Sequence, residues 1–290
     1  MKRISREHTV PPHLRHQVRE PVAEVELGET FFVETINFRT PIIRTSADAN
    51  PKKYREREET GPIFVKGIAP GDILAIEILD IQPEGHASGG WWNDPKVNSF
   101  LAIRDGRVHF PGGLWAPLHM MIGDIRVQPL KDEGNPWDYG GNMDFKDISV
   151  GHTLMLRAQL PGGLLVLGDI HAAQGDGEML GLAAECAAEV TLRITKEETW
   201  PVERPTVRKP HSFVSIACRR GDYTIARDQA IADATRILAT LKGCSEAEAR
   251  LYVMTVGDLR NGAIWSMGKT EPAWCKHVPL VVGVEVPLLD

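Results

Sequence analysis

The sequence predicts an α+β, mainly β fold in which a β-sandwich or barrel-like core precedes a C-terminal helical segment. Short β-rich runs alternate with loops rich in glycine, proline and tryptophan over most of the chain, and helical spacing of apolar residues occurs near its end. With 290 residues, 42% of them hydrophobic, the chain is long enough to bury a sizeable core. We expect one domain over residues 1–290, or two packed lobes of about residues 1–199 and 200–290 joined by the proline-rich stretch Trp200–Pro210.

Three segments share a pattern that predicts strands: a glycine, then a polar residue, then a β-rich run. They are Val25–Glu34, Ile68–Glu77 and Ile148–Arg157. A glycine at this place suits a tight turn that leads into a strand. The spacing between the segments is irregular, which argues against a solenoid repeat. The other predicted strands are Asp124–Pro129, Leu164–Leu167, Glu189–Ile194, Phe213–Ala217 and Val278–Val286.

Two helices are predicted after most of these strands. Tyr223–Leu241 carries apolar residues at helical spacing, among them Ile231 and Leu238. Ser245 is followed three residues later by Glu248, a combination that forms a capping box and predicts the start of a second helix.

Charge and hydropathy argue against several classes of partner. The net charge is -6, and the lysines and arginines form no basic stripe, so we do not expect a nucleic-acid partner. No stretch approaches the roughly 20 apolar residues of a membrane helix, and the charged start Met1–His8 lacks the apolar run of a secretory signal. The 4 cysteines lie far apart and are expected to be buried free thiols in a reducing compartment. We therefore expect a cytoplasmic protein without a membrane partner.

The densest polar cluster of the chain is Gly168–Glu178, directly after an apolar run. If the strand continues to His171, then Asp169 and His171 point to one face, because side chains alternate along a strand. A carboxylate beside an imidazole can bind a metal, and zinc accepts both ligand types. The glycines at 175 and 177 allow a sharp turn that brings Asp176 and Glu178 toward the same face. An acidic turn with a hydrogen-bonded histidine and no metal remains the alternative.

A second polar cluster is Tyr139–Asp144, at the end of the loop Gly134–Asp144. Two glycines before Asn142 and Asp144 suit a close approach of the backbone to a ligand. Asn142 could donate to a carbonyl oxygen, and Asp144 could be a metal ligand or a base. A plain turn is the alternative. This loop and the loop His86–Pro95 are expected to form walls of a site.

Several well-known catalytic motifs are absent from the sequence. It contains no Gly-x-Ser-x-Gly elbow, no glycine-rich phosphate loop ending in Gly-Lys-Ser/Thr, and no Gly-x-Gly-x-x-Gly after a strand. We therefore expect neither a serine nucleophile nor a nucleotide cofactor.

At these clusters the sequence resembles the acetamidase/formamidase family, over roughly Gly28–Pro287. The matching pieces are Gly61–Val65, Ala69–Asp72, Met121–Gly123, Gly140–Asp144 and Gly168–Glu178, and the last two are specific when found together in this order. The resemblance implies a β-rich fold with flanking helices, hydrolysis of a short amide of the formamide or acetamide type to acid and ammonia, a divalent metal, and a homo-oligomer built from dimers. The sequence departs from the family at Lys66, where an acidic residue is expected, and at Asp124, where an apolar residue is expected. Both departures bear on substrate and activity more than on the fold.

On this resemblance we hypothesise metal-assisted hydrolysis of an amide bond. Asp144, Asp169 and His171 hold the ion, with zinc as the first choice and calcium as the alternative, so that a bound water ionises near neutral pH. Glu178 takes the proton from this water and later gives it to the leaving ammonia. Supporting roles are expected for Asp176, which orients His171, for Asn142, which stabilises the oxyanion, and for Gln174, which binds substrate with Asn142.

Three other functions stay open at this point. A γ-lactamase would use the same chemistry on a cyclic amide in a differently shaped pocket. A metal-bound small-molecule binding protein would keep the site without turnover. A structural β-module at a protein interface would have no bound metal.

Overall fold

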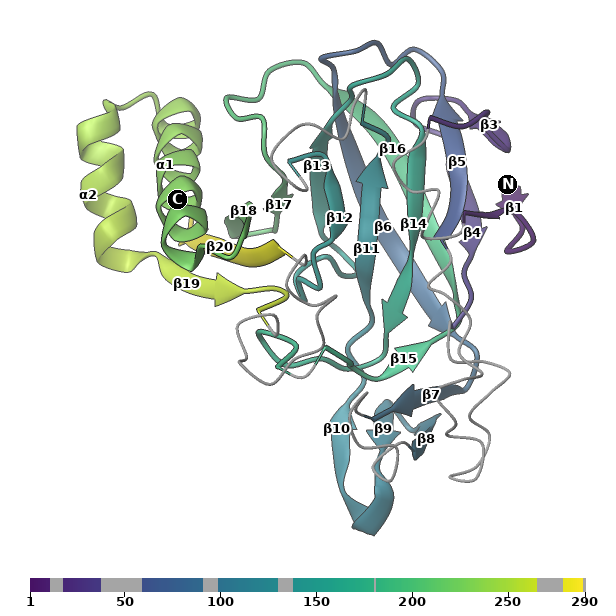
Figure 1. The fold of residues 1–290 in the computed structure, drawn as a ribbon. Coiled ribbons are helices and arrows are strands. Elements are labelled where there is room, and N and C mark those ends of the chain that lie inside the picture. The colour runs from purple at the N-terminus through teal and green to yellow at the C-terminus, as the bar shows by residue number, and fades with distance from the viewer. Residues whose placement is uncertain are drawn as a thin grey trace.

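The structure is a computed structural model that describes residues 1–10, 18–37, 59–90, 99–129, 138–179, 181–264 and 279–288. Two open β-sheets pack face to face, and a pair of helices lies beside the C-terminal strands of one of them (Figure 1). The mainly β fold with a C-terminal helical segment is confirmed. Because the sheets do not close on themselves, the core is a sandwich and not a barrel.

Nine of the described strands form the first sheet. Its long central strands β6 and β16 pair antiparallel over almost their full length, from Ala188↔Pro83 to Glu197↔Ile73. In spatial order the strands are β1 (Lys2–Ile4), β4 (Thr30–Glu34), β16 (Ala188–Glu197), β6 (Ile73–Pro83), β13 (Thr153–Arg157), β17 (Thr206–Arg208), β18 (Ser212–Arg220), β20 (Pro279–Pro287) and β19 (Asp258–Asn261).

The second sheet contains eleven of the described strands. Its main path is β10 (Trp115–Pro117), β9 (Arg107–His109), β8 (Ser99–Arg104), β7 (His86–Gly89), β15 (Glu185–Cys186), β14 (Leu165–His171), β11 (Met121–Val127) and β12 (Gly140–Asn142). Off this path, β5 (Glu59–Val65) pairs with β14 and with the short strands β2 (Thr9–Val10) and β3 (Ala23–Val25). A 3-10 turn, Pro111–Gly113, precedes β10.

The three glycine patterns form the turns that the sequence predicts. Gly28, Gly71 and Gly151 have φ values of 78°, 93° and 83°, a region that only glycine enters without strain. Each of these turns precedes a strand of the first sheet, namely β4, β6 and β13. The other predicted strands also exist with shifted ends: β11 begins at Met121 rather than Asp124, and β14 continues to His171.

Most of the apolar side chains between the sheets form one core. It includes Val33, Ile76 and Leu154 of the first sheet and Ile122 and Leu167 of the second, all fully buried. Burial of this kind contributes roughly 25 cal/mol per Å² of apolar surface and is the main force that holds the two sheets together.

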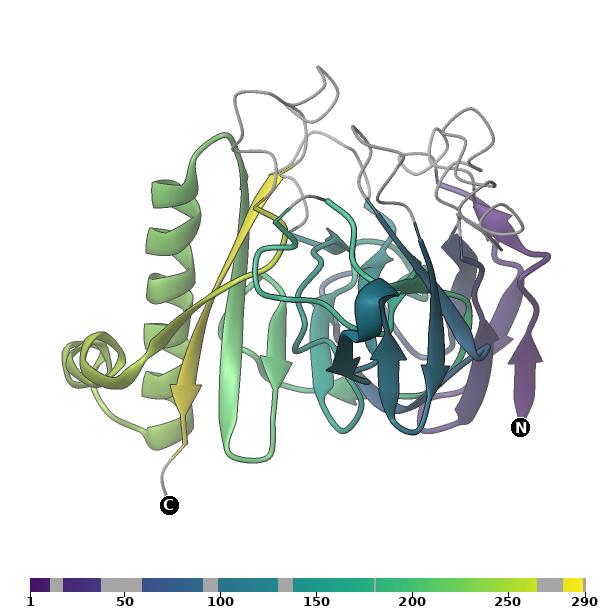
Figure 2. The same cartoon turned by 90° about the horizontal axis from the view of Figure 1, so that it is seen from below.

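Both predicted helices are present, and the second has its predicted capping box. In α1 (Tyr223–Lys242), the side chain of Asp222 accepts from the amide of Ile225 at the start, and Gly243 at the end is left-handed. In α2 (Glu246–Val256), Ser245 and Glu248 form the predicted capping box. Figure 2 shows the long helix α1 lying alongside strand β20.

The two helices form a second apolar core against β18 and β20. The opposite face of β18 belongs to the first core, between the sheets. Phe213 and Ala217 of β18 pack toward α1 and α2, whereas Val214 and Ile216 on the opposite face belong to the core between the sheets. The stretch Trp200–Pro210, predicted as a linker, contains strand β17, which pairs with both β13 and β18. The first sheet therefore runs without a break across the boundary between the two proposed lobes.

Two further predictions concern membranes and cysteines. Among the described residues, no helix combines the length and the apolar character needed to cross a membrane. Cys186 and Cys218 are buried free thiols, as expected, and Cys244 is free and partly exposed. Cys275 and parts of the predicted wall loops, including Trp91, Trp92 and Trp137, lie outside the described residues.

Candidate functional site

Five buried side chains meet where β14 ends and β15 begins in the second sheet. Asp169 and His171 lie on β14, Glu185 lies opposite His171 on β15, Asp144 follows β12, and Glu178 follows the glycine turn after β14. Each is at most 3% exposed. The structure therefore brings together all four residues proposed as metal ligands or base, and it adds Glu185.

The backbone is strained at three of these residues. Asp144, Asp169 and Glu178 have φ values of 46°, 58° and 41°, in the left-handed region that side chains other than glycine rarely adopt. Such a conformation costs of order 1–3 kcal/mol per residue and persists only where the surroundings impose it. Asp169 therefore departs from regular strand geometry, so the alternation expected along β14 is not what aims its carboxylate at His171.

The distances around His171 match those of a metal site. Its Nε2 atom lies 3.1 Å from Oε2 of Glu185 and 3.6 Å from Oδ1 of Asp169. Ligands bound tetrahedrally to zinc at about 2.0–2.1 Å are about 3.3 Å apart. Asp169, His171 and Glu185 form one group of potential ligand atoms within 4.8 Å of one another, and Asp144, His171 and Glu178 form a second.

Gly123 leaves the space in which two of the carboxylates meet. A Cβ atom at this position would lie 2.8 Å from Oδ1 of Asp144 and 2.9 Å from Oδ2 of Asp169. It would also lie 2.7 Å from the backbone oxygen of Asp169. The two carboxylates therefore converge above Gly123, and any larger residue would displace them.

Gln174 fixes the orientation of the imidazole. Its Oε1 atom lies 2.7 Å from Nδ1 of His171, and its Nε2 atom donates to the backbone oxygen of Asp144. Because an amide oxygen only accepts, Nδ1 must carry the proton, which leaves Nε2 of a neutral imidazole with a lone pair for a ligand. Gln174 thus supports two site residues from within the protein, and its predicted contact with substrate remains a prediction.

Asn142 lies against Asp144. Its Nδ2 atom donates to Oδ2 of Asp144 over 2.6 Å, and both side chains are buried. One N–H of the amide is used in this bond, and the second is left for another acceptor.

Asp176 does not contact His171, although the sequence analysis assigned it to orient this residue. Its carboxylate lies 2.8 Å from Nζ of Lys146 and 3.3 Å from Nε of Arg260, and about a third of its side chain is exposed. The turn between Gly175 and Gly177 directs Asp176 outward while Glu178 points inward. The contact expected of Asp176 is made by Gln174.

The electrostatic surroundings perturb two groups strongly. Burial, and after it the negative charge of Asp144, raises the pKa of Glu178 well above its usual value. Neither carboxylate oxygen of Glu178 has a hydrogen-bond partner among the described residues. Burial lowers the pKa of His171, but the charge of Glu185 and the contact with Asp169 outweigh it, so this pKa is raised well above its usual value.

A second buried charged cluster lies on the same strands and explains Asp124. Nη1 of Arg126 donates to Oδ1 of Asp124 over 3.0 Å, and the guanidinium also contacts Glu59. Burial lowers the pKa of Arg126, but the charges of Glu59 and Asp124 outweigh it, so the arginine stays charged. Asp124 therefore belongs to an internal ion-pair cluster.

The other departure from the family pattern, Lys66, lies at the surface. Its side chain is 48% exposed, and Nζ lies 2.9 Å from Oε1 of Glu26 and 3.5 Å from Oε2 of Glu24. It makes none of the site contacts described above.

Glu185 is the site residue that the sequence analysis missed. The available signal was a lone acidic residue in the apolar run from Leu182 to Ala188, where burial of a charge requires a partner. Its neighbour Cys186 is no candidate nucleophile, since burial raises the pKa of its thiol and keeps it protonated.

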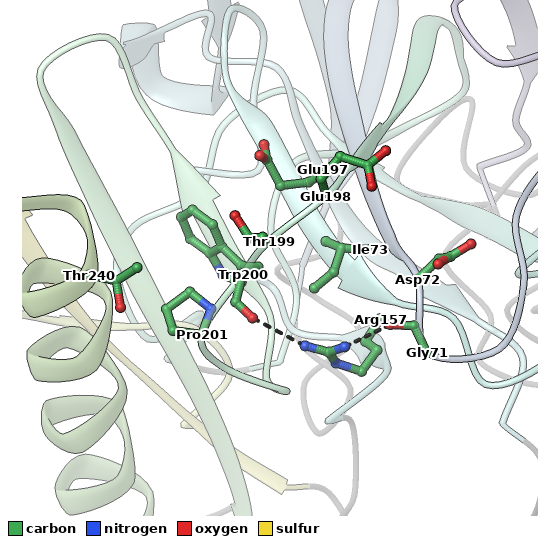
Figure 3. Close-up of a pocket in the computed structure, with 10 residues that line it drawn as sticks. All are labelled: Gly71, Asp72, Ile73, Arg157, Glu197, Glu198, Thr199, Trp200, Pro201 and Thr240. Atoms are coloured by element: carbon green, nitrogen blue, oxygen red, sulfur yellow. Dashed lines mark hydrogen bonds between the residues drawn. The ribbon is translucent and has the colours of Figure 1, made fainter.

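A cavity of about 360 Å³ elsewhere in the fold is a weaker candidate (Figure 3). Two of its charged side chains, Arg157 and Asp72, already have partners within the protein. Arg157 donates to the backbone oxygens of Gly71 and Trp200, and Asp72 pairs with Lys196 at 3.0 Å. None of the residues that line it belongs to the His171 cluster.

A protein-family model matches most of the chain. The model of the Acetamidase/Formamidase family matches residues 2–105 and 131–255. A Schizosaccharomyces pombe protein with a provisional formamidase name is 26% identical over 258 residues, which cover 62% of this chain and 63% of that protein. The chain thus spans somewhat less than two thirds of this curated relative.

Solved structures share the fold. The crystal structure of an acetamidase from Bacillus halodurans has 29% sequence identity and a TM-score of 0.82, and the alignment covers 99% of this chain and 97% of that one. A gamma lactamase from Delftia acidovorans has 19% identity and a TM-score of 0.58, with 95% of this chain and 88% of that chain covered. The likeness to the lactamase concerns the fold alone.

Proposed function

Because this chain belongs to the acetamidase/formamidase family, we propose that it hydrolyses a short aliphatic amide of the formamide or acetamide type to a carboxylic acid and ammonia. One observation carries the proposal beyond family membership. Glu178, a buried carboxylate without a hydrogen-bond partner among the described residues, lies beside a histidine whose Nε2 faces two more carboxylates. Buried charge of this kind is stable only beside a cation or with a bound proton.

We propose that the site holds a divalent cation. His171, Asp169 and Glu185 would bind it, because their separations fit a tetrahedral ion, and Asp144 would be a further ligand. Zinc is our first choice since it accepts nitrogen and oxygen together, and calcium, which prefers oxygen ligands, is the alternative. When bound, the ion would lower the pKa of a water molecule toward about 7.

The side chains around this position would move the protons. Glu178 takes a proton on a carboxylate oxygen from the attacking water and passes it to the leaving nitrogen, so that the C–N bond breaks and ammonia forms. Its raised pKa suits a group that must hold a proton between these steps. The second N–H of Asn142 is our candidate donor to the oxyanion, a contact typically worth roughly 3 kcal/mol. Gln174 keeps Nε2 of His171 available.

Ammonia release tests the proposed reaction. Purified protein loaded with zinc is incubated with formamide, acetamide and a γ-lactam, with Glu178→Gln as the matched control. We expect ammonia from a linear amide with the wild type and none with the variant. No ammonia from either linear amide and no ring opening of the γ-lactam would leave a metal-bound binding protein as the better account.

A γ-lactamase is the second candidate, supported by the shared fold with the lactamase of Delftia acidovorans. The same amide panel separates the two, because a lactamase would release an amino acid from the ring without free ammonia.

We also propose a cytoplasmic homo-oligomer, built from dimers. Two apolar side chains of α2, Leu251 and Met254, are 72% and 61% exposed, and we propose this face of the helix as part of the contact between subunits. Light scattering of the purified protein, compared with Leu251→Lys, tests the assembly.

A further inference from the structure

One C-terminal segment, residues 258–264, is bonded to both loops that carry the strained site residues. On one side its strand β19 pairs with β20, and the ladder continues where the amide of Gly262 donates to Val281 and the amide of Val281 donates to Ala263. We call residues 258–264 the clasp.

On its other side the clasp binds the residues directly before Asp144 and Glu178. The amide of Gly177 donates to the oxygen of Asn261 over 3.2 Å, and the amide of Ile264 donates back to Gly177 over 3.1 Å. The amide of Ala263 donates to the oxygen of Met143 over 3.0 Å. Main-chain bonds of this kind restrain the backbone dihedrals next to the two left-handed residues.

The contact is also tight. A Cβ atom at Gly262 would lie 2.2 Å from the oxygen of Met143, and one at Gly177 would lie 2.9 Å from Cγ1 of Ile264. Phe145, which follows Asp144, packs against β20, because a Cβ atom at Gly283 would lie 2.4 Å from its ring. The loop carrying Asp144 is therefore held on both sides of that residue.

One side chain of the clasp binds the glycine turn itself. Nε of Arg260 lies 3.3 Å from Oδ2 of Asp176, and Nη2 lies 2.9 Å from Oδ2 of Asp147. The third contact of the guanidinium is with Glu285 on β20. The planar fork of an arginine can hold several carboxylates in fixed directions, which a single ammonium cannot do.

We propose that Arg260 is a positioning residue, which holds the turn Gly175–Gly177 through Asp176 so that Glu178 faces the site. The inference rests on the proposed function and deepens it. The turn has glycine on both sides of Asp176, so its own conformational preference is weak. Residues 258–264 lie outside the stretch that matches the family model, yet they support the site.

The test compares two arginines of similar burial. Arg260→Met removes the contact with the turn. Arg204→Met removes an ion pair with Asp233 that touches no site loop, and the two arginine side chains are 17% and 18% exposed. Measured with metal-loaded protein well below the melting temperature, kcat for the amide should fall by about 10- to 100-fold in Arg260→Met, with a smaller change in KM. In Arg204→Met kcat should stay at the wild-type value.

A milder variant keeps the test decisive if Arg260→Met folds poorly. Asp176→Asn, at a partly exposed position, should also lower kcat, and the loss in the double variant should be smaller than the product of the two single losses, because both changes remove the contact between Arg260 and Asp176. Equal loss of kcat in Arg260→Met and Arg204→Met, or additive effects of Asp176→Asn and Arg260→Met, would overturn the proposal.

Hydrogen exchange separates this inference from the proposed function. Amides of residues 175–179 should exchange faster in Arg260→Met than in the wild type and at the wild-type rate in Arg204→Met, whether or not any amide is hydrolysed. Unchanged exchange of this turn would overturn the positioning role even if the amidase activity is found.

Discussion

Two buried charged clusters lie side by side in the second sheet and differ in what balances them. Around Arg126 the chain supplies its own cation, since the guanidinium contacts Glu59 and Asp124. Around His171, within the described residues, four carboxylates meet one imidazole: Asp144, Asp169, Glu178 and Glu185. Glu178 has no hydrogen-bond partner for either oxygen in that part of the chain.

The contrast separates a structural cluster from a functional one. A buried ion pair that is complete contributes little net stability but is costly to break. A buried carboxylate without a partner costs free energy in the folded protein unless something else binds to it, and functional sites are where such costs are tolerated. The two clusters should therefore respond in opposite ways when one charge is removed.

The largest expected effect is on catalysis by Glu178→Gln. Loss of the group that moves the proton should lower kcat by about 10²- to 10⁴-fold. Because the change removes a buried charge, the metal-free protein should be no less stable than the wild type. Metal content should stay unchanged, and loss of the metal would instead make Glu178 a ligand. Ammonia release, metal analysis and thermal unfolding check the three statements.

Arg126→Met should mainly change stability. It leaves Glu59 and Asp124 buried without their cation, which typically costs about 3–5 kcal/mol. Urea unfolding of metal-free protein measures this loss. The metal content of the molecules that fold should match that of the wild type, and a parallel loss of metal would show that the clusters are coupled.

Gly123→Ala tests whether the two carboxylates above this residue act together. The added methyl group would lie 2.8 Å from Oδ1 of Asp144 and 2.9 Å from Oδ2 of Asp169, so at least one of them must move. We expect metal affinity to fall by about 10- to 100-fold, as for other disturbances next to ligands. Calorimetric titration measures the affinity, and wild-type binding would show that these two groups are not both ligands.

The smallest expected effect is a pH dependence at Glu285 of β20, which contacts Arg260 of the clasp. Burial raises its pKa, but hydrogen bonds from Lys209 and Ser212 and the charge of Arg260 outweigh it, so the pKa is lowered from 4.5. A carboxyl with a lowered pKa stabilises the fold above its unfolded pKa, and this contribution is lost as the pH falls through the folded pKa. Glu285→Gln should therefore flatten the fall in stability below pH 4.5, by under about 1 kcal/mol. Urea midpoints at pH 3.5, 4.5 and 7 would reveal it, and an unchanged slope would contradict it.

Local signals in the sequence predicted much of the fold. The turns at Gly28, Gly71 and Gly151 and the capping box at Ser245 depend on neighbouring residues alone, and all were placed correctly. Strand β17 was missed because a proline-rich stretch suggests a loop, whereas its pairing with β13 and β18 comes from distant parts of the chain.

In the site too, contacts within one segment were predictable from the sequence, whereas contacts between distant segments were not. Asp169 and His171 stand in one segment, so their proximity was predictable. Glu185 joins them through the pairing of β14 with β15, a register that the local sequence does not specify. The contact expected of Asp176 depended on the direction of a glycine turn, and a turn with two glycines does not fix its direction locally.

The account depends most on a cation at the His171 cluster. Zinc is titrated calorimetrically into wild-type protein that has been stripped with a chelator, beside Glu185→Gln and Glu178→Gln. We predict binding of about one ion per chain with release of protons, affinity reduced about 10- to 100-fold in Glu185→Gln, and near wild-type affinity in Glu178→Gln. Absence of binding to the folded wild type, by zinc and by calcium alike, would contradict the account.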